Sequence, residues 1–169
     1  MPSNELLMTV PLLLILVVAT IMDWHRHRIT NVLSFGATLF GLILQATVNG
    51  ASGVLIGAGG WLVCLIFLLP FYAKGGMAAG DVKLMAAVGV FLGPIGGFFA
   101  CVFTLVAGGL IGLASIGVAW GRSRLATAST DRHFTLDEAR RTRIPYAGAI
   151  AAGTSFVLLV PGVIPASFT

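Results

Sequence analysis

Charged residues are scarce in this sequence. Asp, Glu, Lys and Arg together make up only 9% of its 169 residues, whereas soluble globular domains carry roughly a quarter. Hydrophobic residues reach 57%, and the mean hydropathy is +1.00. This composition excludes an ordinary soluble domain. Long apolar stretches separated by short polar ones predict an all-α, polytopic membrane protein, and they lack the strict alternation of a transmembrane barrel.

Cysteine is also scarce, with only two residues. Cys64 and Cys101 both lie in apolar stretches without CxxC spacing, which excludes a disulfide framework and a zinc site and predicts packed thiols. We expect neither a metal nor a cofactor. The net charge of +4 and the pI of about 9.7 do not indicate a nucleic-acid partner, because the basic residues are confined to a few connections.

The apolar stretches predict about six transmembrane helices in a single domain over residues 1–169. Their expected ranges are 6–22, 32–48, 54–72, 82–96, 98–119 and 145–160. The first is expected to be a retained span, because no basic segment precedes it and a basic one follows it. The "GPIGG" turn at 93–97 separates the fourth span from the fifth. The capping-box spacing of Thr135 and Glu138 predicts a further short helix over 136–143.

The positions of Lys and Arg predict the orientation in the membrane. Arg26 and Arg28 lie in the first connection, and Lys74 and Lys83 lie in or beside the third, whereas the second connection, "NGASG", carries no charge. The fifth connection is rich in arginine: Arg122, Arg124, Arg132, Arg140, Arg141 and Arg143. The positive-inside rule therefore places the first, third and fifth connections in the cytoplasm and both termini outside.

Two acids stand at the cytoplasmic edge of this predicted bundle. Asp23 ends the first span in "IMDWHRHRITN", and Asp81 opens the fourth in "GGMAAGDVKLMAAVG". Each has a structural alternative, Asp81 as a helix N-cap and Asp23 as a boundary charge paired with Arg26 or Arg28. Two carboxylates at one depth, with few other titratable groups in the chain, favour a catalytic pair instead, because an ionisable residue at the membrane boundary is costly.

The chemistry available to such a pair is that of the aspartic proteases. Two carboxylates held close together cannot both ionise cheaply, so one keeps its proton. The ionised member can take a proton from an attacking water while the other protonates the carbonyl oxygen. Gly75, Gly76 and Gly80 leave the loop before Asp81 without side-chain bulk, so an extended substrate could approach there, and a plain flexible turn is the alternative.

These segments resemble the type IV prepilin peptidase family, a branch of the GxGD intramembrane aspartyl proteases. "GGMAAGDVKLMAAVGVFLG" is similar to the family's second-aspartate segment, "DWHRHRITN" to its first, and "RIPYAGAIAAG" to the segment that enters the last span. The resemblance covers essentially the whole chain and implies about six helices, with Asp23 and Asp81 as the catalytic residues. Lys83 and Asn31, in the same two segments, are candidate supporting residues. For Lys83, reaching the headgroup zone is the alternative.

The resemblance also implies a reaction. The expected substrates are prepilins and pseudopilins, whose basic leader is cut at the cytoplasmic face of the bacterial inner membrane, with the pilus-assembly machinery as a further partner. The chain is similar to the short form used with pili of the Flp, or tight-adherence, type. Its first connection is too short for the insert of the longer, methylating members, so methyltransferase activity is not expected.

Two positions depart from the family pattern. Ala78 stands where the GxGD pattern has its first glycine, and Thr30 stands where a proline precedes Asn31. An alanine is tolerated at such a position unless the backbone there needs a positive φ. Both acids are intact, so the departures bear on efficiency and substrate preference.

Two other classes of function compete with the peptidase. A small proton- or ion-coupled transporter also uses intramembrane acids, but usually near the midplane and often within inverted repeats. A noncatalytic platform protein of the pilus machinery would use the aspartates as caps. Substitution by Asn discriminates, because Asn caps a helix about as well as Asp but does not replace a catalytic acid.

Overall fold

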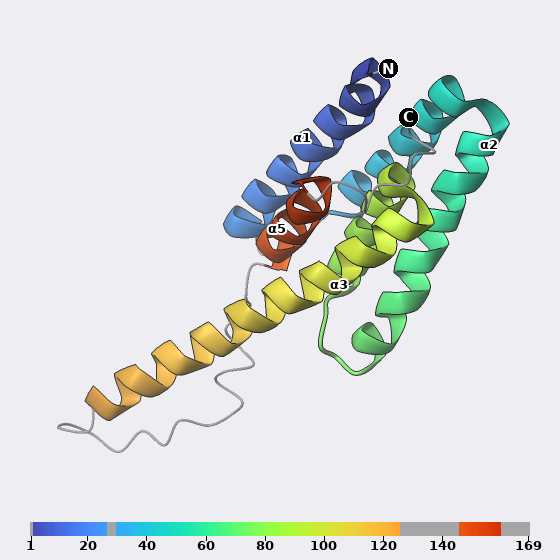
Figure 1. Cartoon of the computed structure of the whole chain (residues 1–169). Helices are drawn as coiled ribbons and strands as arrows, with labels where there is room; N and C mark the ends of the chain where they lie inside the picture. The colour runs from blue at the N-terminus through green and yellow to red at the C-terminus, as the bar shows by residue number, and fades with distance from the viewer. Residues whose placement is uncertain (1, 27–29, 126–145, 160–169) are drawn as a thin grey trace.

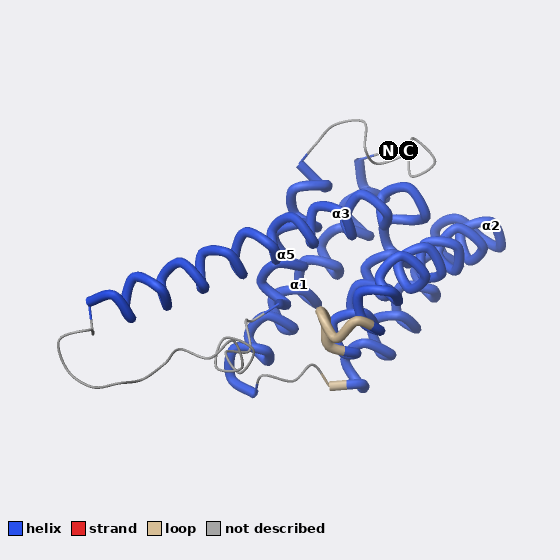
Figure 2. Tube along the Cα trace, turned by 90° about the horizontal axis from the view of Figure 1, so that it is seen from below, coloured by secondary structure: helices blue, strands red, loops and turns tan. Residues whose placement is uncertain are grey.

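The computed structural model describes residues 2–26, 30–125 and 146–159, and its regular elements there are all helices (Figure 2). They are α1 (Pro2–Arg26), α2 (Asn31–Ala73), α3 (Ala79–Leu125) and α5 (Tyr146–Leu159). Three segments are long and apolar enough to cross a membrane: Leu6–His25, Asn31–Ala73 and Ala79–Ala114. The expected all-α membrane protein agrees with this architecture. Six crossings and outside termini stay predictions, and the expected helix over 136–143 lies outside the described residues.

α2 and α3 each reverse direction at a glycine, as the hairpin bends in Figure 1 show. Gly50 has a φ of 64° and Gly93 a φ of 69°, a left-handed conformation that glycine adopts without steric cost. Pro94 follows Gly93 directly, and proline suits the first turn of a helix. The described residues therefore form six helical segments from four elements.

The helices extend beyond the ranges that hydropathy predicts. α1 continues to Arg26, and the second leg of α3 continues to Leu125 instead of ending at 119. Apolarity marks where a helix meets lipid, whereas its hydrogen bonding continues through polar residues. The predicted boundary between the fourth and fifth spans, at 97, lies a few residues too late, because Gly93 takes the positive φ and Gly97 lies within the next helical leg.

The first leg of α3 forms the centre of the bundle. All residues from Leu84 to Leu92 are buried, as expected for a helix that is apolar all round. Gln45, fully buried in α2, donates from Nε2 to the carbonyl oxygen of Val90 over 3.0 Å and accepts a bond from Asn49 over 2.9 Å. Buried polar groups need such partners, so this network fixes α2 against α3 near their reversals.

Small residues allow α2 and α3 to approach closely. A Cβ atom added to Gly60 would overlap the backbone of Gly89, and one added to Gly89 would overlap that of Gly60. Contacts between small residues are typical of helix packing in membranes. Cys64 and Cys101 lie at the same interface as buried free thiols, which confirms the expectation of packed cysteines.

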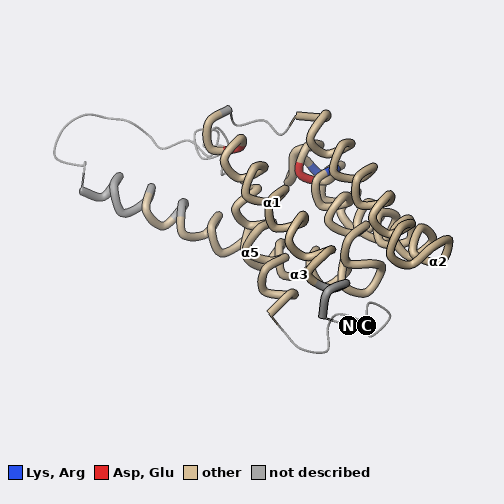
Figure 3. The backbone as a smooth tube through the Cα atoms, turned by 90° about the horizontal axis from the view of Figure 1, so that it is seen from above, with Lys and Arg blue, Asp and Glu red and all other residues tan. Residues whose placement is uncertain are grey.

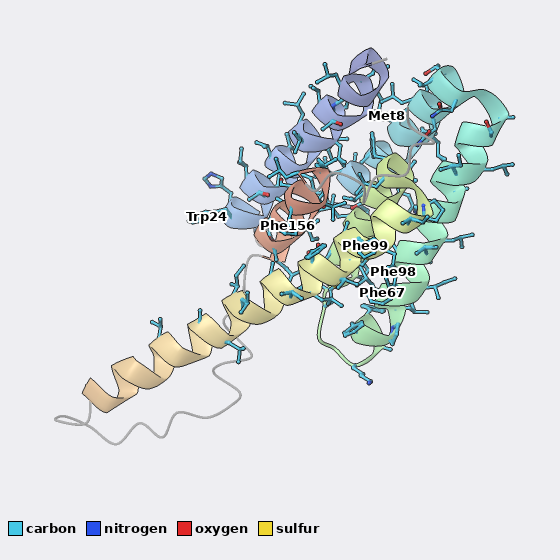
Figure 4. The ribbon with its side chains drawn as sticks, in the orientation of Figure 1. Met8, Trp24, Phe67, Phe98, Phe99 and Phe156 are labelled. Atoms are coloured by element: carbon cyan, nitrogen blue, oxygen red, sulfur yellow. The ribbon has the colours of Figure 1, made fainter. Side chains whose placement is uncertain are left out.

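Aromatic side chains lie both in the bundle and on its outside (Figure 4). Phe67 of α2 and Phe98 of α3 meet edge to face, with ring centroids 5.2 Å apart. Trp24, near the end of α1, is 72% exposed and points away from the bundle. An exposed tryptophan at the end of an apolar helix suits the membrane interface.

Candidate active site

The two predicted acids lie at opposite ends of their helices and come together in the fold. Asp23 is near the end of α1 and Asp81 is in the first turn of α3, with acidic residues red in Figure 3. Each side chain is 8% exposed, and the two are close enough for their charges to interact. A buried carboxylate is costly unless it is hydrogen-bonded, so the partners of each acid decide how it is held.

Asp81 is the third residue of α3. The carbonyl oxygen of Ala78 accepts the N–H groups of Asp81 over 3.1 Å and of Val82 over 3.3 Å, which makes Ala78 the N-cap. The Asp81 carboxylate interacts in return with the backbone N–H of Ala78, as the acidic member of a capping box does. Asp81 is therefore not the N-cap of α3, as the structural alternative had it, because it lies three residues after the N-cap. A carboxylate has about four lone-pair sites, so Asp81 keeps acceptor capacity for other groups.

Asp23 is held by the last described helix. The backbone N–H of Ala147 donates to Asp23 Oδ2 over 3.1 Å. Ala147 is the second residue of α5, and the first N–H groups of a helix have no acceptor within that helix. A carboxylate at this place also interacts favourably with the helix macrodipole. The alternative partners, Arg26 and Arg28, have side chains outside the described part of the structure.

Gly75 and Gly76 form a defined helix stop. Gly75 has a φ of 73° and donates its N–H to Tyr72 O over 2.9 Å, while Gly76 donates to Phe71 O over 3.0 Å. This pair of bonds is the Schellman motif, so the plain flexible turn is not what the structure contains. Both glycines are exposed, whereas Gly80 lies in the first turn of α3. Their role in admitting a substrate stays a prediction.

Lys83 and Asn31, the two candidate supporting residues, bond to each other. Lys83 Nζ donates to Asn31 Oδ1 over 3.0 Å and lies 5.4 Å from the centroid of the Phe35 ring. Lys83 thereby links the beginning of α3 to the first turn of α2.

Both departures from the family pattern fall on helix N-caps. Thr30 caps α2 with φ −72° and ψ 139°, a φ that proline also adopts. Ala78 caps α3, and its side chain is exposed. Neither change therefore disturbs the start of the helix that follows it.

The start of α5 is a part of the site that the sequence did not predict. Tyr146 is half-buried, its ring packs against Gly108 of α3, and it is close enough to Asp81 for an electrostatic interaction. The only sign in the sequence is a tyrosine, one of two in the chain, at the start of the last apolar stretch. In the described residues, no three His, Cys, Asp or Glu side chains gather where they could hold a metal ion.

The described helices include three segments long and apolar enough to cross a membrane, and they bury two carboxylates close enough for their charges to interact. The model of the type IV leader peptidase family matches residues 10–113, and the chain belongs to this family. The match spans both aspartates and ends before α5. No curated protein and no solved structure matches the chain. Membership confirms the resemblance seen in the sequence and assigns a peptidase function of the leader-peptidase type.

Proposed function

We propose that the chain is an aspartic endopeptidase of the bacterial inner membrane that removes the basic leader peptide of prepilins or pseudopilins at the cytoplasmic face during pilus assembly. Family membership supports the peptidase class. The observation that carries the aspartic mechanism is the pair Asp23 and Asp81. Two carboxylates, each 8% exposed, come from separate helices of an apolar bundle and lie close enough to interact.

In this mechanism the pair acts on one peptide bond. One carboxylate takes a proton from water as the water oxygen attacks the carbonyl carbon, and the other carboxyl gives its proton to the carbonyl oxygen. When the C–N bond breaks, the leaving nitrogen takes the proton that came from water. The carbonyl re-forms and returns the other proton, so both side chains regain their starting states. The leader leaves with a new carboxyl end and the pilin with a new amino end.

The length of α3 supports a site below the membrane surface. Its first leg, from Ala79 to the Gly93 reversal, rises only about 20 Å at 1.5 Å per residue, whereas a hydrocarbon core is roughly 30 Å thick. With the reversal at the outer surface, Asp81 lies beneath the cytoplasmic one. The exposed Gly75 and Gly76 then border the route by which an extended leader reaches the acids.

Cleavage of a co-expressed Flp-type prepilin, followed by gel shift, tests the proposal. Wild type is expected to cut, and Asp23→Asn and Asp81→Asn at matched membrane levels are expected to lose cleavage. Asparagine keeps a side-chain oxygen that can accept the Ala147 or Ala78 N–H, so the structural bonds survive while the acid chemistry does not. Glu5→Gln is the matched control, because Glu5 lies at the other end of α1, and it is expected to cut normally.

Two results would overturn different parts of the proposal. If both Asn variants cut like wild type, the aspartates are structural and the aspartic mechanism must be dropped. If wild type leaves the prepilin intact, the proposed substrate class is wrong.

A further inference from the structure

Asp23 is connected to the rest of the bundle mainly through α5. Among the described helices, α1 has its largest contact with α5 and smaller ones with α2 and α3, and Figure 1 shows α5 beside α1. This contact includes the 3.1 Å hydrogen bond from the Ala147 N–H to Asp23 Oδ2. The position of Asp23 therefore depends on where the first turn of α5 lies.

The second leg of α3, which follows the reversal at Gly93, holds α5 at two levels. At the first turn of α5, a Cβ atom added to Gly108 would lie 2.6 Å from Cε2 and 2.7 Å from Cζ of Tyr146, so the ring rests directly on the backbone of this leg. Two turns later, a Cβ atom added to Gly153 would lie 2.6 Å from the backbone N of Thr104. Tyr146 and Gly153 are seven residues apart and share one face of the helix, so this face of α5 is seated on the second leg at both levels.

The second leg of α3 is in turn fixed to the first leg, which carries Asp81. Thr104 Oγ1 donates to Met85 Sδ over 3.8 Å, one helical turn beyond Asp81. A Cβ atom added to Gly97 would lie 3.2 Å from the Cα atom of Gly89, so the two legs also approach closely at small residues. A series of contacts therefore leads from the first leg through the second leg and α5 to the carboxylate on α1.

We propose that Tyr146 is a positioning residue for the proposed cleavage. Its ring, seated on Gly108, fixes the first turn of α5 and so sets where the Ala147 N–H holds Asp23. This inference rests on the proposed peptidase function and adds a residue to it, since the family match ends at residue 113, before α5 begins, and assigns no role to Tyr146. A displacement of about 1 Å in a reacting group costs up to about 100-fold in rate, so the seat affects turnover without touching the substrate.

Steady-state cleavage of a prepilin by the purified full-length chain tests the proposal through two variants of Tyr146. Tyr146→Ala removes the ring from Gly108, and we expect kcat to fall about 10- to 100-fold while KM stays within about twofold, because Tyr146 does not bind substrate. Tyr146→Phe keeps the ring carbons that contact Gly108, and we expect kcat close to that of wild type. Every rate is measured below the thermal midpoint of the least stable variant, so that unfolding does not lower it.

A pair of adjacent glycines gives a second test, which decides the matter if Tyr146→Ala does not accumulate. Gly108→Ala forces the ring away from the second leg of α3, and we expect kcat to fall as in Tyr146→Ala, again with little change in KM. Gly109→Ala is the matched control, because a Cβ atom there would meet nothing within 4 Å, and we expect wild-type kcat. Equal kcat in the two alanine variants would overturn the proposal.

The remaining outcomes separate this inference from the proposed function. A wild-type kcat in Tyr146→Ala overturns the inference, and so does a raised KM with unchanged kcat, because that places the tyrosine in substrate binding. A kcat as low in Tyr146→Phe as in Tyr146→Ala also overturns it, because the seated ring alone then does not suffice. Asp23→Asn and Asp81→Asn are measured alongside. If they are inactive while Tyr146→Ala is normal, only the inference fails, whereas full activity in both removes the proposed function itself.

Discussion

At the residue scale, each buried aspartate is bound by a backbone N–H at the start of a helix. Ala78 serves Asp81 and Ala147 serves Asp23. A backbone N–H group is fixed by the helix and does not titrate, so it holds a carboxylate in place without neutralising its charge. Such fixed dipoles are a common way to preorganise charged groups in a site from which water is excluded.

In the proposed function, Lys83 stabilises the fold through its contacts with Asn31 and Phe35 and takes no part in peptide-bond cleavage. Lys83→Met removes the 3.0 Å bond and the ring contact, so we expect it to lower the free energy of unfolding by about 1 kcal/mol, a drop of about 2–4 °C in Tm, and to keep cleavage. Lys74→Met, at an exposed lysine just after α2, is the control and is expected to unfold like wild type. Thermal unfolding in detergent makes the comparison, and equal midpoints for the two variants would refute the role of the bond.

The acids themselves were predictable, and their partners were not. Carboxylates are so rare in this chain that two of them at helix ends stand out in the sequence. The partner of Asp23 lies 124 residues away and is the N–H of an alanine, a group that leaves no trace in residue type. The bond between Lys83 and Asn31 was missed for a similar reason, because each residue was weighed only against its own segment.

At the element scale, glycine has two separate uses in this fold. Gly50 and Gly93 reverse α2 and α3 through positive φ, whereas Gly60 and Gly89 are helical and allow close packing. The segments "NGASG" and "GPIGG" could be predicted as turns from composition. Composition could not predict which glycine of "GPIGG" takes the turn. Gly97 packs closely against the Cys64 thiol, and only the folded structure defines this contact.

The close approach of α2 and α3 makes Gly60 intolerant of a side chain. Gly60→Ala places a methyl group on the backbone of Gly89, and we expect a loss of about 1–3 kcal/mol or more from overpacking. Gly36→Ala is the matched control in the first leg of α2, where a Cβ atom meets nothing within 4 Å. It is expected to be neutral or to stabilise by up to about 1 kcal/mol through helix propensity. Thermal midpoints that fall equally in both would contradict the packing.

At the scale of the whole molecule, the helical segments run back and forth between two ends. Figure 1 shows the bend within α2 at one end and the connection between α2 and α3 at the other. The proposed topology places the bend outside and the connection in the cytoplasm, on the same side as the site. On this proposal the acids lie nearer the cytoplasmic side, which is the side on which the proposed substrate carries its leader.

Cysteine labelling in intact cells tests this orientation. Cys64 and Cys101 are fully buried. Because buried thiols react poorly, we expect these two native cysteines to stay unlabelled. Ser52→Cys, just after the bend, is expected to react with a membrane-impermeant maleimide added outside. Lys74→Cys, at the end of α2, is expected to react only after the membrane is opened. Labelling in the reverse order, or of both positions from outside, would refute the proposed topology.

The most direct test of the account is the initial rate of prepilin cleavage by the purified chain carrying Asp23→Asn, Asp81→Asn or both. Two acids that share one reaction act as a unit, so their losses are not additive. We expect each single variant to lower kcat by at least about 10³-fold and the double variant to be no slower than either. A single variant that keeps a rate near that of wild type, or a double variant whose loss is the product of the two single losses, would contradict the proposal that Asp23 and Asp81 are one catalytic pair.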